Sequence, residues 1–470
     1  MGSEMCIRDS LKRERNGNSD NILFIDASSN FEAGKNQNIL RECDIDKIVE
    51  TYERRQDVDK YAHVATMQEI EENGFNLNIP RYVDSSEAAE HWDVYASMFG
   101  GIPTAEIDEM SEFWTAFPAL KKALFTESGI PYVNVSTSDI KSAIKSHPDV
   151  VGFENAFNAA FSTFPAFLKE ELIDGMGSIE ISKAETVLSA DIFDRLKEIP
   201  LIDKYAAFQL LDDDWTGISI DLEMLQTEGF AATKKVDPNL VIKKKDGKDQ
   251  EVQEGWVGHI IPFDLVQATL LSAETDELRG LESRLAEIPS EYESILDEMT
   301  EEDKESCNDV LTEEGDAFVP KEVSKKIKEL KKDRSPESVA LRTLLEKVES
   351  LIKSEKEIKA EIKAKSAALQ AKTKDTIESL SDEQALDLLE KKWIAPLIES
   401  IHKLPDTVID SLVSQIQALQ NKYATTFFEV EQQISETEAT LSGMIDDLEG
   451  NEYDMLGLNE LKKLLGGSAE

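Results

Sequence analysis

This 470-residue sequence has few of the residues that build disulfides, metal sites and nucleophilic active sites. Its three cysteines, Cys6, Cys43 and Cys307, lie far apart with no CxxC spacing, so neither a disulfide framework nor a thiolate zinc site is expected. The five histidines are isolated, with no second histidine at i+3 or i+4. No Gly-x-Ser-x-Gly nucleophile elbow occurs. We therefore expect no metal and no catalytic residue, and a reducing cytoplasm fits the cysteine usage.

Long apolar runs are also missing from the sequence. The most apolar stretch, residues 156–168, is too short to span a bilayer and contains Pro165. The first ten residues, MGSEMCIRDS, lack the apolar core of a signal peptide. The sequence therefore predicts a cytoplasmic protein without a membrane partner.

Basic residues are scarce, because 51 Lys and Arg face 95 Asp and Glu for a formal net charge of −44. A surface this acidic repels a phosphate backbone, so any DNA contact must be local or supplied by a partner. The exception is a basic island over residues 321–375, where 16 basic residues exceed 10 acidic ones. Two interpretations stay open for it: a solvated helix laced with Glu–Lys pairs, or a surface for phosphate or an acidic partner.

Two polar patterns could be taken for ligand sites. Asp212-Asp-Asp-Trp215 has three acids, but adjacent carboxylates on a helix point in different directions, which favours a solvated or capping cluster over a metal site. Gly175-Met-Gly177 lacks the preceding apolar strand that a nucleotide-binding glycine turn needs.

Hydrophobic periodicity predicts a mainly α-helical protein. The apolar run at 21–26 predicts one buried strand of a sheet flanked by helices, although no partner strand is evident nearby. Helices are expected over 44–56, with an apolar face of Ile45, Ile48, Val49 and Tyr52, and over 64–70. An extended segment follows at 75–83. The region 85–320 is expected to be helical, with a small β-hairpin whose turn is Lys243–Asp249.

Two heptad patterns predict long coiled-coil-like helices after Pro336. The first covers 341–369. The second covers 409–448 and shifts by four residues at Ile434, a stutter that locally unwinds a supercoil. The two arms could fold back on each other or open to accept helices of another chain. The candidate partner-binding positions are Leu341, Leu344, Val348, Leu351, Ile416, Leu419 and Tyr423.

Five sequence blocks stand in order between residues 21 and 84. They are NILFIDAS (21–28), GKNQN (34–38), IVETY (48–52), YAHVA (61–65) and NLNIPRYVD (76–84). In this order they resemble the segment just past the catalytic sheet of the modification (M) subunit of type I restriction-modification systems, a family of N6-adenine DNA methyltransferases. WDVYASMFGG (92–101) and the ending at 451–465 resemble the tail of one branch of that family.

The resemblance implies an enzyme that uses S-adenosylmethionine to methylate adenine at N6 in a DNA site chosen by a specificity subunit, with a restriction subunit as a further partner. The family's Asn-Pro-Pro-aromatic and Gly-rich loops lie upstream of Asn21, and neither occurs here, since none of the 14 prolines has a proline neighbour. We therefore expect this chain alone to be inactive and to bind no cofactor. Lys35, Asn36 and Asn38 form a candidate DNA-facing loop, with loop ordering by side-chain hydrogen bonds as the alternative.

The expected organisation has four parts. Residues 1–10 are interpreted as a non-native leader, 11–84 as the C-terminal remnant of an α/β methyltransferase sheet domain, 85–320 as a mainly helical family-specific region, and 321–470 as an assembly tail. Residues 21–52 are expected to be poorly held, because their sheet neighbours are absent. The expected function is subunit assembly, with DNA reached through the intact complex. The alternatives are an acidic DNA mimic and a coiled-coil interaction protein without enzyme activity.

Overall fold

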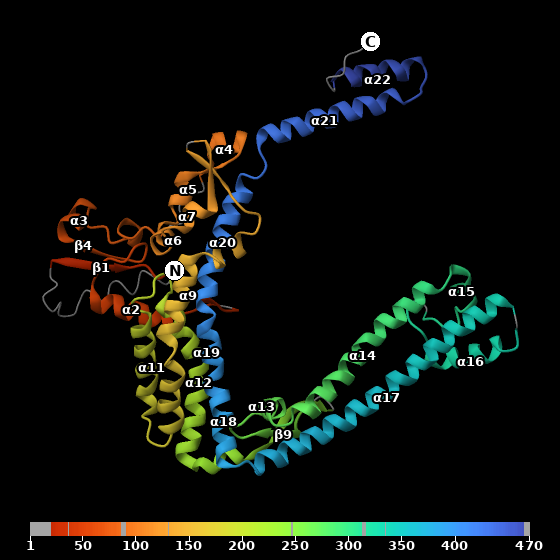
Figure 1. Cartoon of the computed structure of the whole chain (residues 1–470), viewed down its shortest axis with the longest axis horizontal. Helices are drawn as coiled ribbons and strands as arrows, with labels where there is room; N and C mark the ends of the chain where they lie inside the picture. The colour runs from red at the N-terminus through yellow and green to blue at the C-terminus, as the bar shows by residue number, and fades with distance from the viewer. Residues whose placement is uncertain are drawn as a thin grey trace. The chain divides into compact units, whose positions relative to one another are not determined.

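The computed structural model describes residues 20–35, 37–85, 91–129, 131–245, 248–312, 316–333 and 335–464. These residues fold mainly into helices, which confirms the predicted mainly-α class (Figure 1). The chain divides into two compact units. Unit 1 comprises Met1–Leu168, Glu180–Thr216 and Leu397–Glu470, and unit 2 comprises Lys169–Ile179 and Gly217–Pro396. Within the described ranges, no helix has the length and apolar character needed to cross a membrane.

The first strand of unit 1 finds a partner within the chain. β1 (Asn21–Ile25) pairs antiparallel with β4 (Ala62–Thr66). The prediction of a helix from residue 64 is therefore wrong for its first turn, because pairing with β1 satisfies backbone groups that a helix would otherwise satisfy. The helix α3 (Met67–Glu72) begins only after Thr66, whose hydroxyl accepts the Glu69 N–H in a capping box.

A small core holds this N-terminal segment. The buried residues are Phe24, Ala65, Ile70, Tyr82 and Val83, and the rings of Phe24 and Tyr82 stack with centroids 4.0 Å apart. The segment expected to be extended at 75–83 contains a short 3-10 helix, η1 (Ile79–Arg81). The strand at 21–25 therefore has both a pairing partner and a core, although its cluster is small.

The helix α2 (Glu42–Arg54) buries its polar face and not the apolar face that was predicted to be buried. Cys43, Asp44 and Thr51 are buried, whereas Ile45, Val49 and Tyr52 are 38%, 47% and 65% exposed. The prediction that this apolar stripe packs into a core is wrong for these three side chains. The polar face is held instead by hydrogen bonds to a neighbouring helix, described below.

The rest of unit 1 is a helical bundle with a small three-stranded sheet in the order β5-β7-β6, which the sequence did not predict. Its strands are β5 (Ile102–Pro103), β6 (Phe125–Gly129) and β7 (Tyr132–Val135). Its helices are α4 (Val94–Phe99), α5 (Thr104–Asp108), α6 (Ser111–Ala116), α7 (Leu120–Leu124), α8 (Ile140–Lys145), α9 (Pro148–Phe161), α10 (Phe164–Leu168), α11 (Ile181–Leu196), the first part of α12 (Lys204–Glu228), most of α19 (Ala395–His402), and α20 (Leu404–Lys422).

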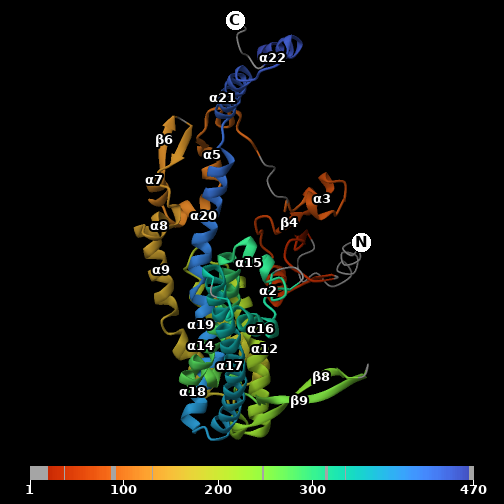
Figure 2. The same ribbon diagram turned by 90° about the vertical axis from the view of Figure 1, so that its right-hand side faces the viewer.

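Unit 2 contains the predicted hairpin and a pair of long helices. β8 (Val236–Lys245) and β9 (Lys248–Gly258) form a two-stranded ribbon, and residues 246–247 of the predicted turn lie outside the described residues (Figure 2). The remaining elements are η2 (Lys169–Asp174), η3 (Phe230–Lys234), α13 (Phe263–Thr269), α14 (Ser272–Glu298), α15 (Glu301–Ser306), α16 (Pro320–Leu330), α17 (Pro336–Glu378) and α18 (Asp382–Trp393).

The first heptad pattern lies on α17, and its partner is α14. The two helices run side by side (Figure 1), and α16 packs on the end of α17 nearest Pro336. Neither α14 nor α16 was expected to cover the heptad face. We call α14, α15, α16 and α17 the helical arm.

The second heptad pattern does not form one helix. α20 ends at Lys422, and α21 (Phe427–Asp446) starts after Thr426, whose hydroxyl accepts the Glu429 N–H at 3.1 Å. The predicted continuous helix over 409–448 is therefore wrong, because this capping box begins a new helix before the stutter at Ile434. α22 (Glu452–Leu464) follows and lies against α21.

We predict that Phe24→Ala will loosen the N-terminal segment. Removing a buried ring that stacks on Tyr82 should cost about 3 kcal/mol of local stability. Hydrogen exchange at β1 and β4 amides should then accelerate strongly. Leu23→Ala, at the neighbouring half-buried position, is the control and should have a smaller effect. Equal acceleration in both variants would contradict the assigned core.

Candidate functional site

The predicted DNA-facing loop is a short surface hairpin. Asn38 lies on β3 (Asn38–Ile39), which pairs with β2 (Glu32–Ala33), and Lys35 lies in the connection between them. Both side chains are exposed, and Asn36 lies outside the described residues. The backbone N–H of Gly34 donates to the Gln37 carbonyl at 3.1 Å, so the backbone itself closes the loop. A DNA contact by this loop stays a prediction.

The seven heptad residues proposed to bind a partner face the chain's own cores. Leu341 and Val348 of α17 are buried with Ile295 of α14 and Val323 of α16, and Leu344 and Leu351 pack against the same cluster. Ile416 is buried with residues of α7 and α8, and Leu419 packs beside it. Tyr423 is also buried. A partner could reach these side chains only if the intramolecular contacts were exchanged.

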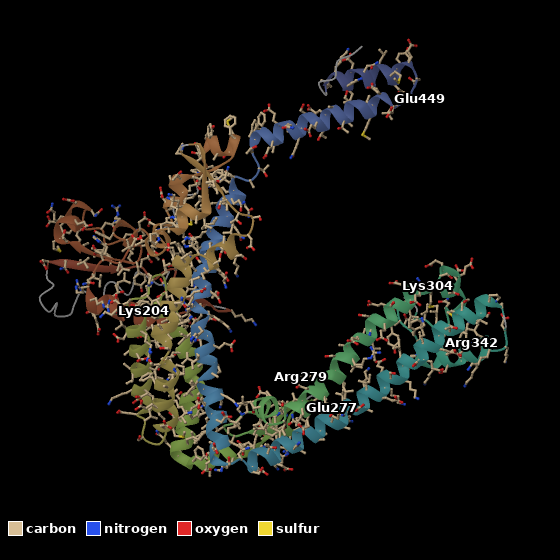
Figure 3. The ribbon with its side chains drawn as sticks, viewed as in Figure 1. Lys204, Glu277, Arg279, Lys304, Arg342 and Glu449 are labelled. Carbon is tan, nitrogen blue, oxygen red and sulfur yellow. The ribbon has the colours of Figure 1, made fainter. Side chains whose placement is uncertain are left out.

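Acidic residues of α14 neutralise part of the basic island on α17. Lys365 pairs with Glu277, Lys372 pairs with Glu274, and the Lys347 ammonium lies 3.4 Å from Glu298. Figure 3 shows Glu277 on α14 and Arg342 on the facing helix α17. These pairs fit the interpretation of a helix laced with Glu–Lys pairs, and a surface for phosphate or an acidic partner stays a prediction.

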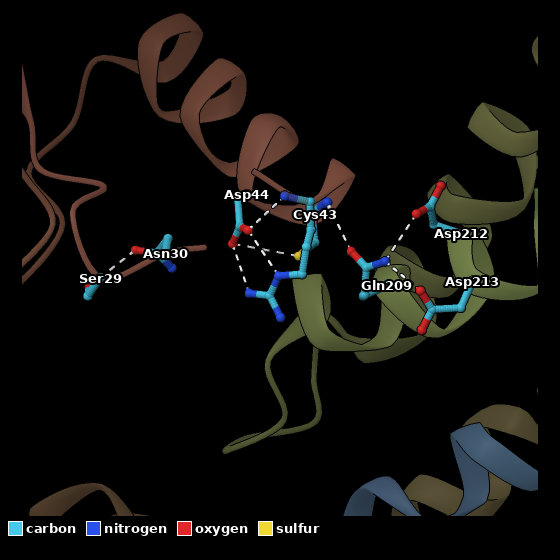
Figure 4. Close-up of polar contacts among 8 residues, drawn as sticks. Ser29, Asn30, Cys43, Asp44, Gln209, Asp212 and Asp213 are labelled. Atoms are coloured by element: carbon cyan, nitrogen blue, oxygen red, sulfur yellow. Dashed lines mark hydrogen bonds and ion pairs between the residues drawn. The ribbon is translucent and has the colours of Figure 1, made fainter. Parts of the chain in front are cut away.

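Polar contacts join the N-terminal segment to α12 within unit 1. The Cys43 backbone N–H donates to Gln209 Oε1 at 3.4 Å, and Gln209 Nε2 donates to Asp212 and Asp213 at 3.0 and 2.7 Å (Figure 4). Asp212 and Asp213 therefore accept from an amide three and four residues earlier on α12, inside the helix and not at its end. Burial, together with Asp44, raises the pKa of the Cys43 thiol to about 11, so this cysteine is no thiolate nucleophile.

Acidic side chains surround the contact between α2 and α12. Burial, reinforced by the Asp212 carboxylate and by Glu42 and Asp46 of α2, raises the pKa of Glu185 to about 7. Among the residues that the structure describes, no group of three or more His, Cys, Asp or Glu side chains could hold a metal ion. A proton on Glu185 reduces the repulsion between its carboxylate and the acids of α2 and α12.

A second polar cluster anchors the end of α20 to α5. The Lys422 ammonium lies 2.8 Å from Glu106 Oε2, and the Tyr423 hydroxyl donates to the other Glu106 oxygen. Tyr423 also accepts the Asp93 N–H at 3.1 Å. Burial by itself would lower the pKa of Lys422, but the Glu106 carboxylate outweighs it and raises that pKa. We call Glu106, Lys422 and Tyr423 the polar anchor.

Beyond the polar anchor, the chain leaves apolar side chains uncovered. Ile434, Leu441 and Met444 of α21 are 52%, 44% and 62% exposed. The tail surface consists of these three together with Leu448, Tyr453, Leu456, Leu461 and Leu464, all exposed. Such a row of exposed apolar residues on helices marks an interaction surface.

A further set of apolar side chains is exposed on α4, which contacts α21, and just before it. Trp92, Val94, Tyr95 and Phe99 are each more than half exposed, and α4 lies against α21. Hydrophobic periodicity does not predict the exposure of these side chains. The available signal was the shortness of the α4 segment, which ends at Gly100-Gly101 and is too small to bury aromatics on every side.

We predict a pH-dependent effect of Glu185→Gln. A raised pKa means that the stabilisation involving Glu185 is complete below about 4.5 and is lost as the pH rises through about 7. The variant should therefore be more stable than the parent at pH 8 by on the order of 1–2 kcal/mol, after solvent screening, and indistinguishable near pH 4.5. Urea unfolding across this range measures the difference. The exposed-site control Glu198→Gln should show no such trend.

We also predict that Lys422→Met will release the polar anchor. It leaves the mostly buried Glu106 carboxylate without its cation, which should cost about 2–3 kcal/mol of stability in unit 1. Protease cleavage between Lys422 and Phe427 should rise in parallel. Lys403→Met, which removes an exposed pair with Glu399, is the control and should leave cleavage unchanged. An unchanged unfolding curve for Lys422→Met would refute the anchoring role.

Comparison with known proteins gives matches near the N-terminus. Residues 6–91 match the family model described as N-6 DNA Methylase. The methylase subunits of the type I restriction enzymes MjaVII and MjaVIII from Methanocaldococcus jannaschii are 38% and 32% identical over 96 residues, which is 20% of this chain and 16% of each relative. The chain thus spans under a fifth of the length of these relatives.

A solved structure also matches in part. The crystal structure of the type I restriction-modification system methyltransferase subunit from Streptococcus thermophilus is 52% identical over 14% of this chain and 15% of that chain, with a TM-score of 0.14. This superposition carries no argument about the fold. On these sequence matches, residues 6–91 are similar to the N-6 DNA methylase family and to the methylase subunits of type I restriction enzymes, over about a fifth of the chain.

Proposed function

We propose that this chain is the carboxy-terminal part of a type I modification subunit and that it serves subunit assembly. The observation that carries the proposal is the tail surface, which places exposed apolar side chains along α21 and α22 in a chain whose N-terminal segment is methylase-like. In this proposal α14 and α17 form a coiled-coil-like scaffold, and the partner is the specificity subunit. The restriction subunit and DNA join through the complete complex.

The exposed face of α2 supports the first half of the proposal. Ile45, Val49 and Tyr52 form an apolar row that the described part of the chain leaves uncovered. An amphipathic helix ordinarily covers a sheet or another helix with such a row. The row is what a helix of the methylase domain would present to the strands that precede it in the family.

The charge of the tail supports the choice of partner. Residues 427–464 carry 10 acidic and 2 basic side chains around the apolar row. A helix-in-groove contact needs an apolar stripe on the partner, and complementary charge favours Lys and Arg beside that stripe. We therefore propose that the specificity subunit presents amphipathic helices with basic flanks.

The residues at the end of β1 do not fit S-adenosylmethionine, the cofactor of the intact family. Asp26 follows the strand, and its carboxylate accepts the Ser28 N–H at 3.0 Å and the Ser85 hydroxyl at 2.5 Å, so both oxygens are used within the chain. No Gly-rich turn follows the strand in the sequence. We derive no methyl-transfer step, and we propose that this chain alone is inactive.

Capture of a purified type I specificity subunit tests the assembly role. The double variant Leu441→Ser/Met444→Ser should weaken capture at least roughly tenfold, because buried apolar anchors carry most of the affinity of such contacts. Ile242→Ser on β8 removes an equally exposed apolar side chain outside the tail and is the control. Undiminished capture by the tail variant would rule out this surface as the docking site.

A further inference from the structure

The helix α16 carries a row of lysines on one side. Lys321, Lys325, Lys328 and Lys332 lie on or directly after this helix, with spacings of four, three and four residues, and all four are exposed. At 100° per residue the three positions on the helix, Lys321, Lys325 and Lys328, fall within an arc of roughly 60°, and Lys332 lies in the turn that follows. We call these four residues the lysine stripe.

The stripe is the solvent face of a helix that is firmly packed on its other side. Val323 and Ile327 are buried in the cluster shared with α17, and Leu330 packs beside them. The lysines that flank this apolar face already have partners, since Lys326 lies 3.1 Å from Asp309 and Lys331 lies 3.8 Å from Glu346. The orientation of the stripe is therefore set by packing and leaves the four ammonium groups toward solvent.

The stripe itself is little neutralised. Lys325 is the exception, because Glu322 lies 3.2 Å from it and the charges of Glu329 and Asp309 also act on it. Lys321, Lys328 and Lys332 have no ion pair with any described residue. Although the chain carries a net charge of −44, exposed charges beyond about 8–10 Å are screened at physiological salt, so distant acids do not cancel the stripe.

We infer that the lysine stripe is a docking surface for the phosphate backbone of double-stranded DNA. The helix places three cations, Lys321, Lys325 and Lys328, along about 10 Å, and Lys332 follows in the turn after it, so that the row can follow the closely spaced phosphates of a duplex. Lysines in this arrangement position a protein on DNA without reading its sequence. The inference rests on α16 alone and does not depend on the assembly role proposed for the tail.

Other polyanions fit the stripe less well. Single-stranded nucleic acid is bound with aromatic side chains that stack on the bases, and α16 has none. A membrane surface requires the apolar face of the helix to enter the lipid, but the apolar face of α16 is buried in the arm. An acidic surface of a second copy is the remaining competitor, and the test below separates it.

Binding of the full chain to a short labelled DNA duplex of arbitrary sequence, followed by fluorescence anisotropy between roughly 50 and 200 mM salt, tests the inference. Four phosphate contacts predict a slope of log K against log salt near −3.6, from about 0.9 per contact. The double variant Lys321→Gln/Lys328→Gln should bring the slope to about −1.8 and weaken binding on the order of 50-fold at 0.1 M salt.

Lys356→Gln/Lys363→Gln is the matched control. These two exposed lysines on α17 have the same seven-residue spacing, the same charge change and no ion pair with a described residue, so their replacement should leave slope and affinity unchanged. Circular dichroism of both variants should match the parent, because all four side chains are exposed. No duplex binding by the parent chain, or equal losses in both variants, would overturn the inference. Low-salt self-association that only the stripe variant abolishes, without duplex binding, would also overturn it in favour of a second copy.

Discussion

The architecture of unit 2 depends on burying the apolar face of one very long helix. α17 has 43 residues, and an isolated helix of this length with a row of leucines and isoleucines is not stable in water unless that row is covered. α14 covers it along most of its length and α16 covers the end nearest Pro336. The arm is therefore a local structure, built from helices that follow one another in sequence.

Charge makes the same pairing specific. α14 supplies acids and α17 supplies lysines, so the two helices attract each other in the register that also aligns their apolar rows. Each exposed pair contributes little by itself. Their combined effect is to neutralise part of the positive charge of α17 within the arm.

The N-terminal segment packs a different face of its helix than its hydrophobic pattern predicts. β1 pairs with β4, and α2 turns its polar face to α12 while Ile45, Val49 and Tyr52 stay exposed. The small core around Phe24 and Tyr82 holds the strands. Methylase-like sequence thus lies near the N-terminus of a mainly helical chain, and the described residues leave the apolar row on α2 uncovered.

The sequence alone indicated the mainly helical class, the β8–β9 hairpin, a long heptad helix after Pro336 and the resemblance of residues 21–84 to type I modification subunits, because these follow from short-range periodicity, turn residues and motif order. The predicted arm, 341–369, was shorter than α17, which covers Pro336–Glu378. The sequence did not determine which helices pack against each other. The heptads of α17 were compatible with any apolar partner, and only the fold selected α14. The break before α21 came from Thr426 and Glu429, a capping box that competes with an otherwise continuous heptad pattern. Exposure of the tail surface and of the lysine stripe was likewise a tertiary outcome, since burial depends on contacts between residues far apart in the chain.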